Sequence, residues 1–249
     1  MPHASDWLTA KPIAHRGLHD AANGIVENTA GAVQAALAAG YGIEVDLQIS
    51  ADGEAMVHHD AVLGRITEGE GRLDQLTSAQ LKRVKFRDSA ERMLTLTELC
   101  DLIGGRAVLL PELKSRFDGD DRLAARVAAL LSGYKGPVAP MSFDPVQLQI
   151  LRRKAPKLPR GVVAAQYKPH PYWDQMPPRL RYRMGLLLPS APARPQFVAY
   201  MNDNLPALAP WLARHILCLP LIAWVVRTQA QRQLAARYAD QVIFEGFRP

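Results

Sequence analysis

The chain has 249 residues and a mass of 27.5 kDa, close to the roughly 250 residues that one α/β barrel requires. Its composition, 48% hydrophobic and 22% charged, excludes a disordered chain. The net charge of +6 suggests anionic partners, but no nucleic-acid-binding motif accompanies the basic clusters at 152–160 and 179–183. We therefore expect a single domain over residues 1–249 that binds no nucleic acid.

The two cysteines and the chain's apolar stretches bear on its compartment. Cys100 and Cys218 lie far apart within apolar runs, so they indicate buried thiols rather than a disulfide framework or a zinc motif. The first residues lack the basic and apolar regions of a signal peptide. The longest apolar stretch, 216–226, is shorter than the roughly 20 residues that span a bilayer. We expect a soluble cytoplasmic protein.

Strand-like apolar runs alternate with segments of helical periodicity along most of the chain. The predicted strands are 12–15, 42–49, 107–113, 138–142, 161–165, 197–201, 219–225 and 241–244. The predicted helices between them are 29–39, 120–131, 145–154 and 228–239. A repeated strand-then-helix order is typical of a parallel sheet, and eight strands in one domain favour a closed TIM (β/α)8 barrel.

Two stretches depart from this order. Residues 61–96 contain one convincing helix, 78–84, and a glycine-rich turn, so we interpret them as a small insertion after the second strand that caps the barrel mouth. Residues 169–195 are rich in proline and irregular. Trp173, Tyr182 and the basic residues of this second stretch either line an entrance or form a plain surface connection.

Two predicted strands each carry a pair of charged side chains in their later part. Successive side chains of a strand point to opposite faces, so Glu44 and Asp46 share one face, and so do Glu112 and Lys114. Buried like charges are unfavourable unless a cation compensates them, and Mg²⁺ or Ca²⁺ prefers carboxylate oxygens. A parallel barrel gathers functional groups at its carboxyl end, so we expect a metal site there with Lys114 as a phosphate contact.

Two histidines also end strand-like runs. His15 ends the first predicted strand, and Arg16 beside it offers a fork of donors to phosphate oxygens. His59 follows a short run that ends at Val57, and its neighbour His58 is the weaker candidate. The reference pKa of histidine, near 6.5, allows one imidazole to act as a base and another as an acid near neutral pH.

The order of these segments resembles the glycerophosphodiester phosphodiesterase family. The matching motifs are His15-Arg16-Gly17, Glu27-Asn28-Thr29, Glu44-Val45-Asp46, Asp52-Gly53, His59-Asp60 and Glu112-Leu113-Lys114. Six motifs in order, with fitting gaps, extend over essentially the whole chain. The resemblance implies a TIM barrel that hydrolyses glycerophosphodiesters, such as glycerophosphocholine or glycerophosphoethanolamine, to sn-glycerol 3-phosphate and an alcohol.

The resemblance also implies roles for particular side chains. It makes His15 and His59 the acid-base pair, Glu44, Asp46 and Glu112 the ligands of a divalent cation (Mg²⁺, Ca²⁺ or Mn²⁺), Arg16 and Lys114 the phosphate contacts, and Trp224 an aromatic residue near the glycerol. Trp224 fits a core position equally well. The pattern leaves open which histidine is the base, and whether water or the substrate's own hydroxyl attacks.

Two other functions remain as alternatives. A lysophospholipase D would use the same chemistry on lysophospholipids, with residues 169–195 in peripheral contact with membrane lipid. A catalytically silent barrel would bind phosphate or membranes through its basic face.

The chain departs from the family at Phe244-Glu245-Gly246, where a Thr-Asp pair is usual, and at Pro111 inside a strand. We expect these departures to affect substrate identity more than activity, and the oligomeric state stays open.

Overall fold

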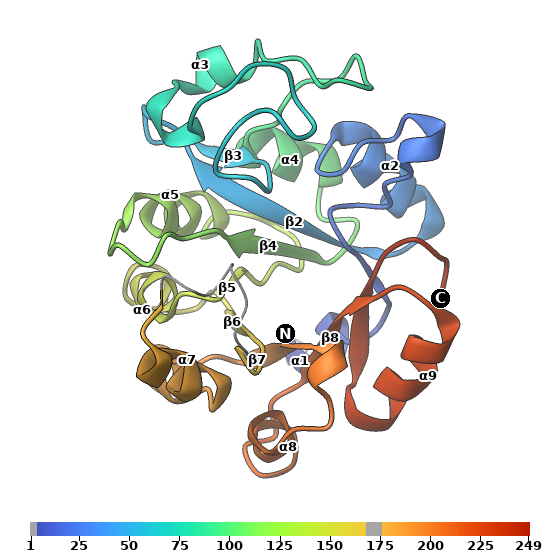
Figure 1. The fold of residues 1–249 in the computed structure, drawn as a ribbon, viewed down its shortest axis with the longest axis vertical. Helices are drawn as coiled ribbons and strands as arrows, with labels where there is room; N and C mark the ends of the chain where they lie inside the picture. The colour runs from blue at the N-terminus through green and yellow to red at the C-terminus, as the bar shows by residue number, and fades with distance from the viewer. Residues whose placement is uncertain (1–3, 168–175) are drawn as a thin grey trace.

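The computed structural model describes residues 4–167 and 176–249. Eight parallel strands close into a barrel, and a ninth, antiparallel strand, β3 (Ala55–Val57), pairs with β2 outside the ring (Figure 1). The order around the ring is β1 (Ile13–Ala14), β9 (Gln241–Phe244), β8 (Leu221–Val226), β7 (Phe197–Met201), β6 (Gly161–Ala164), β5 (Met141–Ser142), β4 (Leu109–Leu113) and β2 (Gly42–Ile49). The pairing of β1 with β2 closes it, which confirms the predicted TIM barrel.

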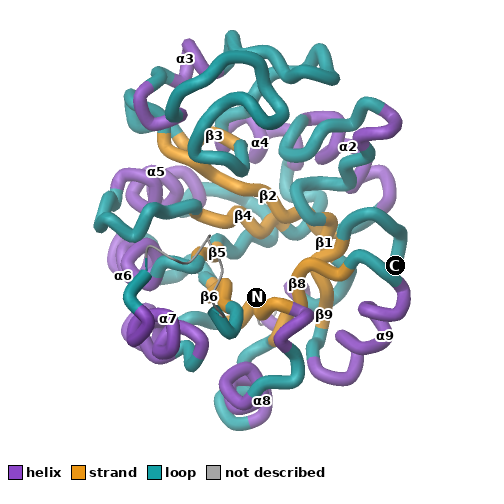
Figure 2. Tube along the Cα trace, viewed as in Figure 1, coloured by secondary structure: helices purple, strands orange, loops and turns teal. Residues whose placement is uncertain are grey.

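Helices surround the strands, as Figure 2 shows by colour. They are α1 (Ala4–Leu8), α2 (Ala30–Ala39), α3 (Ser78–Leu81), α4 (Leu96–Ile103), α5 (Arg122–Leu131), α6 (Pro145–Lys154), α7 (Pro178–Gly185), α8 (Leu208–His215) and α9 (Gln229–Tyr238). Short 3-10 helices are η1 (Ala21–Asn23), η2 (Leu73–Gln75), η4 (Leu188–Ala193) and η5 (Asn202–Asn204). Side-chain oxygens of Thr29, Asp144 and Thr228 accept backbone N–H groups and so begin α2, α6 and α9.

The predicted strands all occur in the structure, and α2, α5, α6 and α9 lie within the predicted helices. The sequence did not predict α4 and α8, and the prediction that the whole of 169–195 is irregular was wrong, because α7 and η4 form there. The pair Pro177-Pro178 explains that error, since proline suits the first turn of a helix as well as a loop. Tyr182 is 70% exposed, and Trp173 lies outside the described residues.

Two apolar layers build the barrel. Inside the ring, alternate strand residues pack on one another: Ile13, Leu110, Met141, Val163, Phe197, Ala199, Ile222 and Ile243. The residues between them point outward and bury the apolar faces of the helices. Gly161 is required in this interior, because a Cβ there would lie 2.1 Å from the Phe197 ring.

Pro111 is tolerated inside β4 for a local reason. Residues two apart in a strand direct their N–H groups to the same neighbouring strand. The N–H of Leu109 donates to the carbonyl oxygen of Pro137, on the β5 side, so an N–H at position 111 would also face β5. The proline therefore faces β5, where only one residue pair, Glu112 with Met141, forms the ladder. The missing donor shortens the β4–β5 pairing and leaves the β2–β4 ladder intact.

Residues 61–96, which we call the insertion segment, follow β3 and contain η2 and α3 (Figure 1). Leu63, Leu73, Leu81 and Met93 bury one another together with Met56 of β3, so the segment has a small core of its own. Asp52, in the turn between β2 and β3, accepts hydrogen bonds from the backbone N–H and the hydroxyl of Ser78 and so holds α3 to the barrel.

The cysteines differ from the expectation of two buried thiols. Cys100 is half-buried, and burial raises the pKa of its thiol to about 11, but Cys218 is exposed in the turn after α8. The apolar run around Cys218 suggested burial, and that was wrong because the start of the run, at Ile216 and Leu217, is exposed and burial begins only at β8. Within residues 4–167 and 176–249, no helix is both long and apolar enough to cross a bilayer.

Candidate active site

The site lies next to the interior apolar layer, two residues further along each strand towards its carboxyl end. Side chains two positions apart share a face of a strand, so the residue two after each interior residue also points into the barrel. Five strands place a functional side chain there: His15, Glu44, Glu112, Trp224 and Glu245. Asp46 and Lys114 follow one further step along β2 and β4. The structure therefore brings together Glu44, Asp46, Glu112 and Lys114, the four side chains that strand alternation placed at the mouth.

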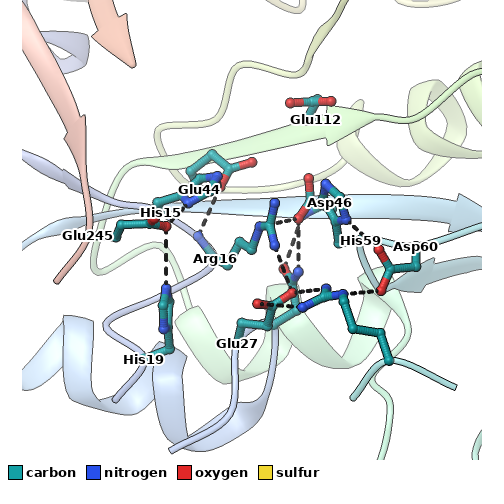
Figure 3. A network of polar contacts seen from close by, with 12 residues as sticks. His15, Arg16, His19, Glu27, Glu44, Asp46, His59, Asp60, Glu112 and Glu245 are labelled. Carbon is teal, nitrogen blue, oxygen red and sulfur yellow. Dashed lines mark hydrogen bonds and ion pairs between the residues drawn. The ribbon is translucent and has the colours of Figure 1, made fainter. Parts of the chain in front are cut away.

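Three carboxylates form the centre of the site. One oxygen each of Glu44, Asp46 and Glu112 lies within 4.8 Å of the others, and all three residues are buried (Figure 3). Burial, with the neighbouring charges of Asp46 and Glu112, raises the pKa of Glu44 well above its usual range. Glu44 Oε1 is buried without a hydrogen-bond partner among the described residues. A hard divalent cation fits this set of oxygen donors.

Two basic side chains stand against these carboxylates. Lys114 Nζ lies 2.8 Å from Asp46 Oδ1 and 2.6 Å from Glu112 Oε1. Arg16 Nε lies 3.1 Å from Asp46 Oδ2. Burial alone would raise the pKa of Asp46, but Lys114 and Arg16 outweigh it and hold that pKa well below its usual range. Lys114 and Arg16 therefore hold Asp46 in its charged form.

The Glu27-Asn28-Thr29 motif supports the site, a role that the sequence did not reveal. Asn28 Nδ2 donates to Asp46 Oδ2 over 2.9 Å, and Asn28 Oδ1 accepts the Asp46 N–H over 3.1 Å. Glu27 accepts a hydrogen bond from Arg16 Nη1 over 2.8 Å and another from Arg65. Arg16 and Asn28 both have left-handed backbone conformations, with φ of 55° and 60°. This turn folds the loop over β2 and fixes both Arg16 and Asp46.

His59 lies at the outer edge of the carboxylate cluster. Its Nδ1 is 2.8 Å from Asp60 Oδ1, and Arg65 Nε donates to the other Asp60 oxygen over 2.6 Å (Figure 3). Burial acts to raise the pKa of Asp60, but the hydrogen bonds with His59 and Arg65 have the larger, opposite effect. The pKa of Asp60 therefore lies well below its usual range. Asp60 thus holds the His59 ring by Nδ1. Burial lowers the pKa of the neighbouring His58 to about 4, so that ring is neutral.

His15 is held by a carboxylate that sequence analysis did not assign. Its Nδ1 lies 2.5 Å from Glu245 Oε2, just after β9, and Arg227 Nε donates to Glu245 Oε1 over 2.6 Å. Burial lowers the pKa of His15, and the hydrogen bond to Glu245 acts in the opposite direction. The signal was present in the sequence, because Glu245 follows the interior residue Ile243 by two positions.

His15, His19 and Glu245 also place ligand atoms within 4.8 Å of one another. Both Glu245 oxygens already accept hydrogen bonds, however, one with His15 and one with the charged Arg227 guanidinium. We therefore interpret Glu245 as a group that orients His15.

Trp224 points into the barrel from β8, two residues after the interior residue Ile222. Its ring meets the edge of Phe143, with centroids 5.6 Å apart. Its Nε1 is buried without a hydrogen-bond partner among the residues that the structure describes. Trp224 is thus both a core residue and a free donor at the mouth.

A cavity of about 410 Å³ opens beside His59 and Lys114. The insertion segment forms one wall, and the loop after β4 forms another. Arg116 of that loop makes ion pairs with Asp118 and, across the cavity, with Asp74 of the insertion segment. The charged side chains that line the cavity are Asp60, Arg65, Arg72, Asp74, Lys114, Arg116, Asp118 and Asp120. Equal numbers of carboxylates and cations therefore surround the space.

The fold and the site define a parallel α/β barrel with a carboxylate and histidine cluster at its mouth. The chain belongs to the glycerophosphoryl diester phosphodiesterase family, whose model matches residues 15–215. A glycerophosphodiester phosphodiesterase of Caldanaerobacter subterraneus subsp. tengcongensis is 33% identical over 161 residues. That match spans 61% of this chain and 65% of the relative, just under two thirds of its length.

Two solved structures have the same fold. A phosphodiesterase of Oleispira antarctica, in complex with the product sn-glycerol 3-phosphate, superposes with a TM-score of 0.74 at 20% identity, over 95% of this chain and 94% of that one. A glycerophosphodiester phosphodiesterase of Agrobacterium tumefaciens superposes with a TM-score of 0.71 at 24% identity, over 94% and 95%. Both confirm the barrel along almost the whole chain.

Proposed function

We propose that this protein hydrolyses glycerophosphodiesters to sn-glycerol 3-phosphate and an alcohol. The observation that carries the proposal is the meeting of three buried carboxylates, two basic side chains and two oriented histidines at one barrel mouth. Membership of the family supports the same reaction. A phosphodiester needs charge compensation on its oxygens and proton transfer at both sides of phosphorus, and this set of groups supplies both.

We assign a divalent cation to Glu44, Asp46 and Glu112. Within residues 4–167 and 176–249 one buried Glu44 oxygen has no hydrogen-bond partner, and this oxygen and the raised pKa of Glu44 both indicate missing positive charge at that point. Oxygen donors favour Mg²⁺, Ca²⁺ or Mn²⁺. When bound, the cation supplies Lewis-acid stabilisation of charge on the phosphoryl oxygens.

The protein's own side chains carry out the remaining steps. Arg16 and Lys114 border the cluster and neutralise negative charge on the diester. His59 lines the cavity. His15 does not line it and instead contacts Glu245. In-line displacement at phosphorus places the attacking and leaving oxygens on opposite sides. We therefore assign His59 as the acid that protonates the leaving alcohol, and His15 as the base that takes a proton from the nucleophile.

We propose that the alcohol head group occupies the cavity of about 410 Å³, with the insertion segment as its cap. The paired charges of its wall suit a small polar or zwitterionic group, such as ethanolamine or choline. They suit an acyl chain poorly, because the chain would lie against Arg116, Asp74 and Asp118 and bury these charges. This observation favours glycerophosphodiesters over lysophospholipids.

The direct test measures release of sn-glycerol 3-phosphate from glycerophosphocholine and glycerophosphoethanolamine, first with EDTA and then with each of the three cations. We expect activity only when a cation is restored, and a lower kcat/KM for the matching lysophospholipids. Product formation in EDTA would refute the cation assignment. Faster turnover of lysophospholipids would refute the head-group assignment and favour a lysophospholipase D.

The cavity assignment makes a separate prediction about specificity. Asp118→Asn removes one lining carboxylate that lies away from the cluster. We expect it to change KM unequally for ethanolamine and choline esters and to leave kcat nearly unchanged. Asp101→Asn, a carboxylate on the outer surface of α4, is the matched control. Equal effects on both substrates would show that the cavity holds the glycerol instead.

The interaction between Glu245 and His15 can be tested through the pH profile. Glu245→Gln keeps the shape of the side chain and removes the charge that raises the pKa of His15. We expect kcat to fall by about tenfold or more, with KM unchanged. We also expect the limb of the pH profile that reports His15 to move to lower pH. A purely structural role for Glu245 would lower stability and leave that limb in place.

A further inference from the structure

The outward side of α8 is apolar although it faces solvent. Leu208, Trp211 and Leu212 of α8 and Ile216 directly after it are 68%, 49%, 41% and 63% exposed, and their positions i, i+3, i+4 and i+8 lie along one side of the helix. Leu217, 66% exposed, extends this row past the end of α8. We call these five residues the α8 row. A contiguous exposed apolar row of this kind marks an interaction surface.

Positive charge flanks the α8 row on both sides. Figure 1 shows α8 between α7 and α9, at the end of the molecule opposite α3. These three helices contain six arginines and no aspartate or glutamate. Residues 145–249 hold 15 basic and four acidic residues, whereas residues 1–144 hold 15 and 20. The two parts of the chain thus carry net charges of +11 and −5, and the α8 row lies in the positive part.

We propose that the α8 row, with the arginines of α7 and α9, docks the protein on bilayers rich in anionic phospholipid. An amphipathic helix that carries leucine, isoleucine and tryptophan, beside arginines, binds in the plane of a membrane surface. Tryptophan prefers the boundary between headgroups and hydrocarbon, which Trp211 would occupy. The surrounding arginines would meet the anionic headgroups.

Two other partners fit this surface less well. A nucleic acid would pair with the arginines but leave the α8 row in water, so the apolar side chains would gain nothing. A second copy that used the same surface would bring the arginines of both copies together, since a two-fold interface places like against like. The combination of apolar and positive character therefore favours an anionic bilayer.

The docked orientation follows from the topology. The chain passes from the carboxyl end of β7 through η5 into α8, so α8 runs back along the side of the barrel. The stretch from Leu208 to Ile216 is about 12 Å long at the helical rise. A barrel that rests on this row lies on its side, and its mouth opens beside the bilayer surface. The docking does not depend on the proposed function.

Sedimentation with lipid vesicles tests the proposal. The probes are vesicles of phosphatidylcholine alone and vesicles of phosphatidylcholine mixed with phosphatidylglycerol, each at low and at high salt. We expect the protein to bind the mixed vesicles at low salt and to bind phosphatidylcholine alone at least tenfold more weakly. Equal binding to both vesicles, or none to either, would overturn the proposal.

Two pairs of variants separate the apolar and the charged contributions. Leu208→Gln/Trp211→Gln/Ile216→Gln should weaken binding tenfold or more, whereas the control Val146→Gln, at a side chain of α6 that is 42% exposed, should not. Arg179→Glu/Arg183→Glu should weaken it by about fivefold for each arginine removed. Arg83→Glu/Lys85→Glu, in the insertion segment, is the control of equal charge change.

Hydrolysis of a water-soluble glycerophosphodiester by the same variants shows whether fold and site are intact, and we expect it unchanged. Loss of vesicle binding in the control variants as large as in the α8 variants would refute the proposal. Sedimentation equilibrium provides a second check. A wild-type dimer that becomes a monomer in the triple α8 variant would show that the row is a contact between copies instead.

Discussion

Glu44→Gln is expected to lower turnover sharply and, at the same time, to stabilise the metal-free protein. Three carboxylate groups lie within 4.8 Å of one another, and Glu44 has one buried oxygen without a partner among the described residues. Glutamine keeps an oxygen that can accept the Arg16 N–H, which Glu44 Oε2 accepts over 2.9 Å. Removing one buried charge should raise the free energy of unfolding by about 1 kcal/mol, while turnover falls by about 10²-fold or more.

Thermal unfolding in EDTA and with added cation measures both effects. We expect the wild-type Tm to rise when Mg²⁺, Ca²⁺ or Mn²⁺ is added, since a ligand of the folded state stabilises it. The variant should begin at a higher Tm in EDTA and respond little to cation. Glu70→Gln removes one exposed charge in the insertion segment and should change neither quantity. A variant that is less stable in EDTA, yet keeps the full cation response, would place the cation elsewhere.

The barrel could be predicted because each of its strands is a short apolar run, and a segment of helical periodicity follows four of them. The same criterion failed at α8, whose outward side carries Leu208, Trp211 and Leu212. With eight residues, α8 spans little more than two helical turns, and Pro210 within it is typical of a turn, so the sequence did not indicate a helix there. Among the helices that the sequence did not predict, α8 is the one whose exposed apolar side chains call for a partner.

The carboxylate cluster could be predicted for a different reason. Alternation within a strand places Glu44 with Asp46, and Glu112 with Lys114, whatever the rest of the chain does. Their convergence then needs only the parallel pairing of β2 with β4, which sets Asp46 beside Glu112. The positions of these side chains depend only on two strands and on the register between them, so they could be predicted from the sequence.

The supporting contacts could not be predicted in this way. Asn28 reaches Asp46 only because the loop turns through left-handed conformations at Arg16 and Asn28. The ion pair of Arg116 with Asp74 joins residues 42 positions apart across the cavity. Glu245 meets His15 through the pairing of the first and last strands of the ring. Each contact requires the closed barrel, and composition or periodicity gives no distance between its partners.

The two histidines should respond differently to the leaving group, and this comparison tests their assigned roles. We expect His15→Ala and His59→Ala each to lower turnover of glycerophosphoethanolamine by about 10²-fold or more, with unfolding midpoints near that of the wild type. A p-nitrophenyl ester of glycerol phosphate has a leaving group that departs without a proton. With that ester, His59→Ala should regain most of its activity, because the group it loses is the acid.

His15→Ala should remain impaired with both esters, because the nucleophile still needs a base. His58→Ala is the matched control: this ring is buried, its pKa of about 4 keeps it neutral, and it does not line the cavity. Recovery by His15→Ala instead of His59→Ala would reverse the two roles and place the leaving alcohol on the Glu245 side. Recovery by neither variant would mean that proton transfer to the alcohol does not limit turnover, and the cavity beside His59 would then lose its assignment as the head-group site.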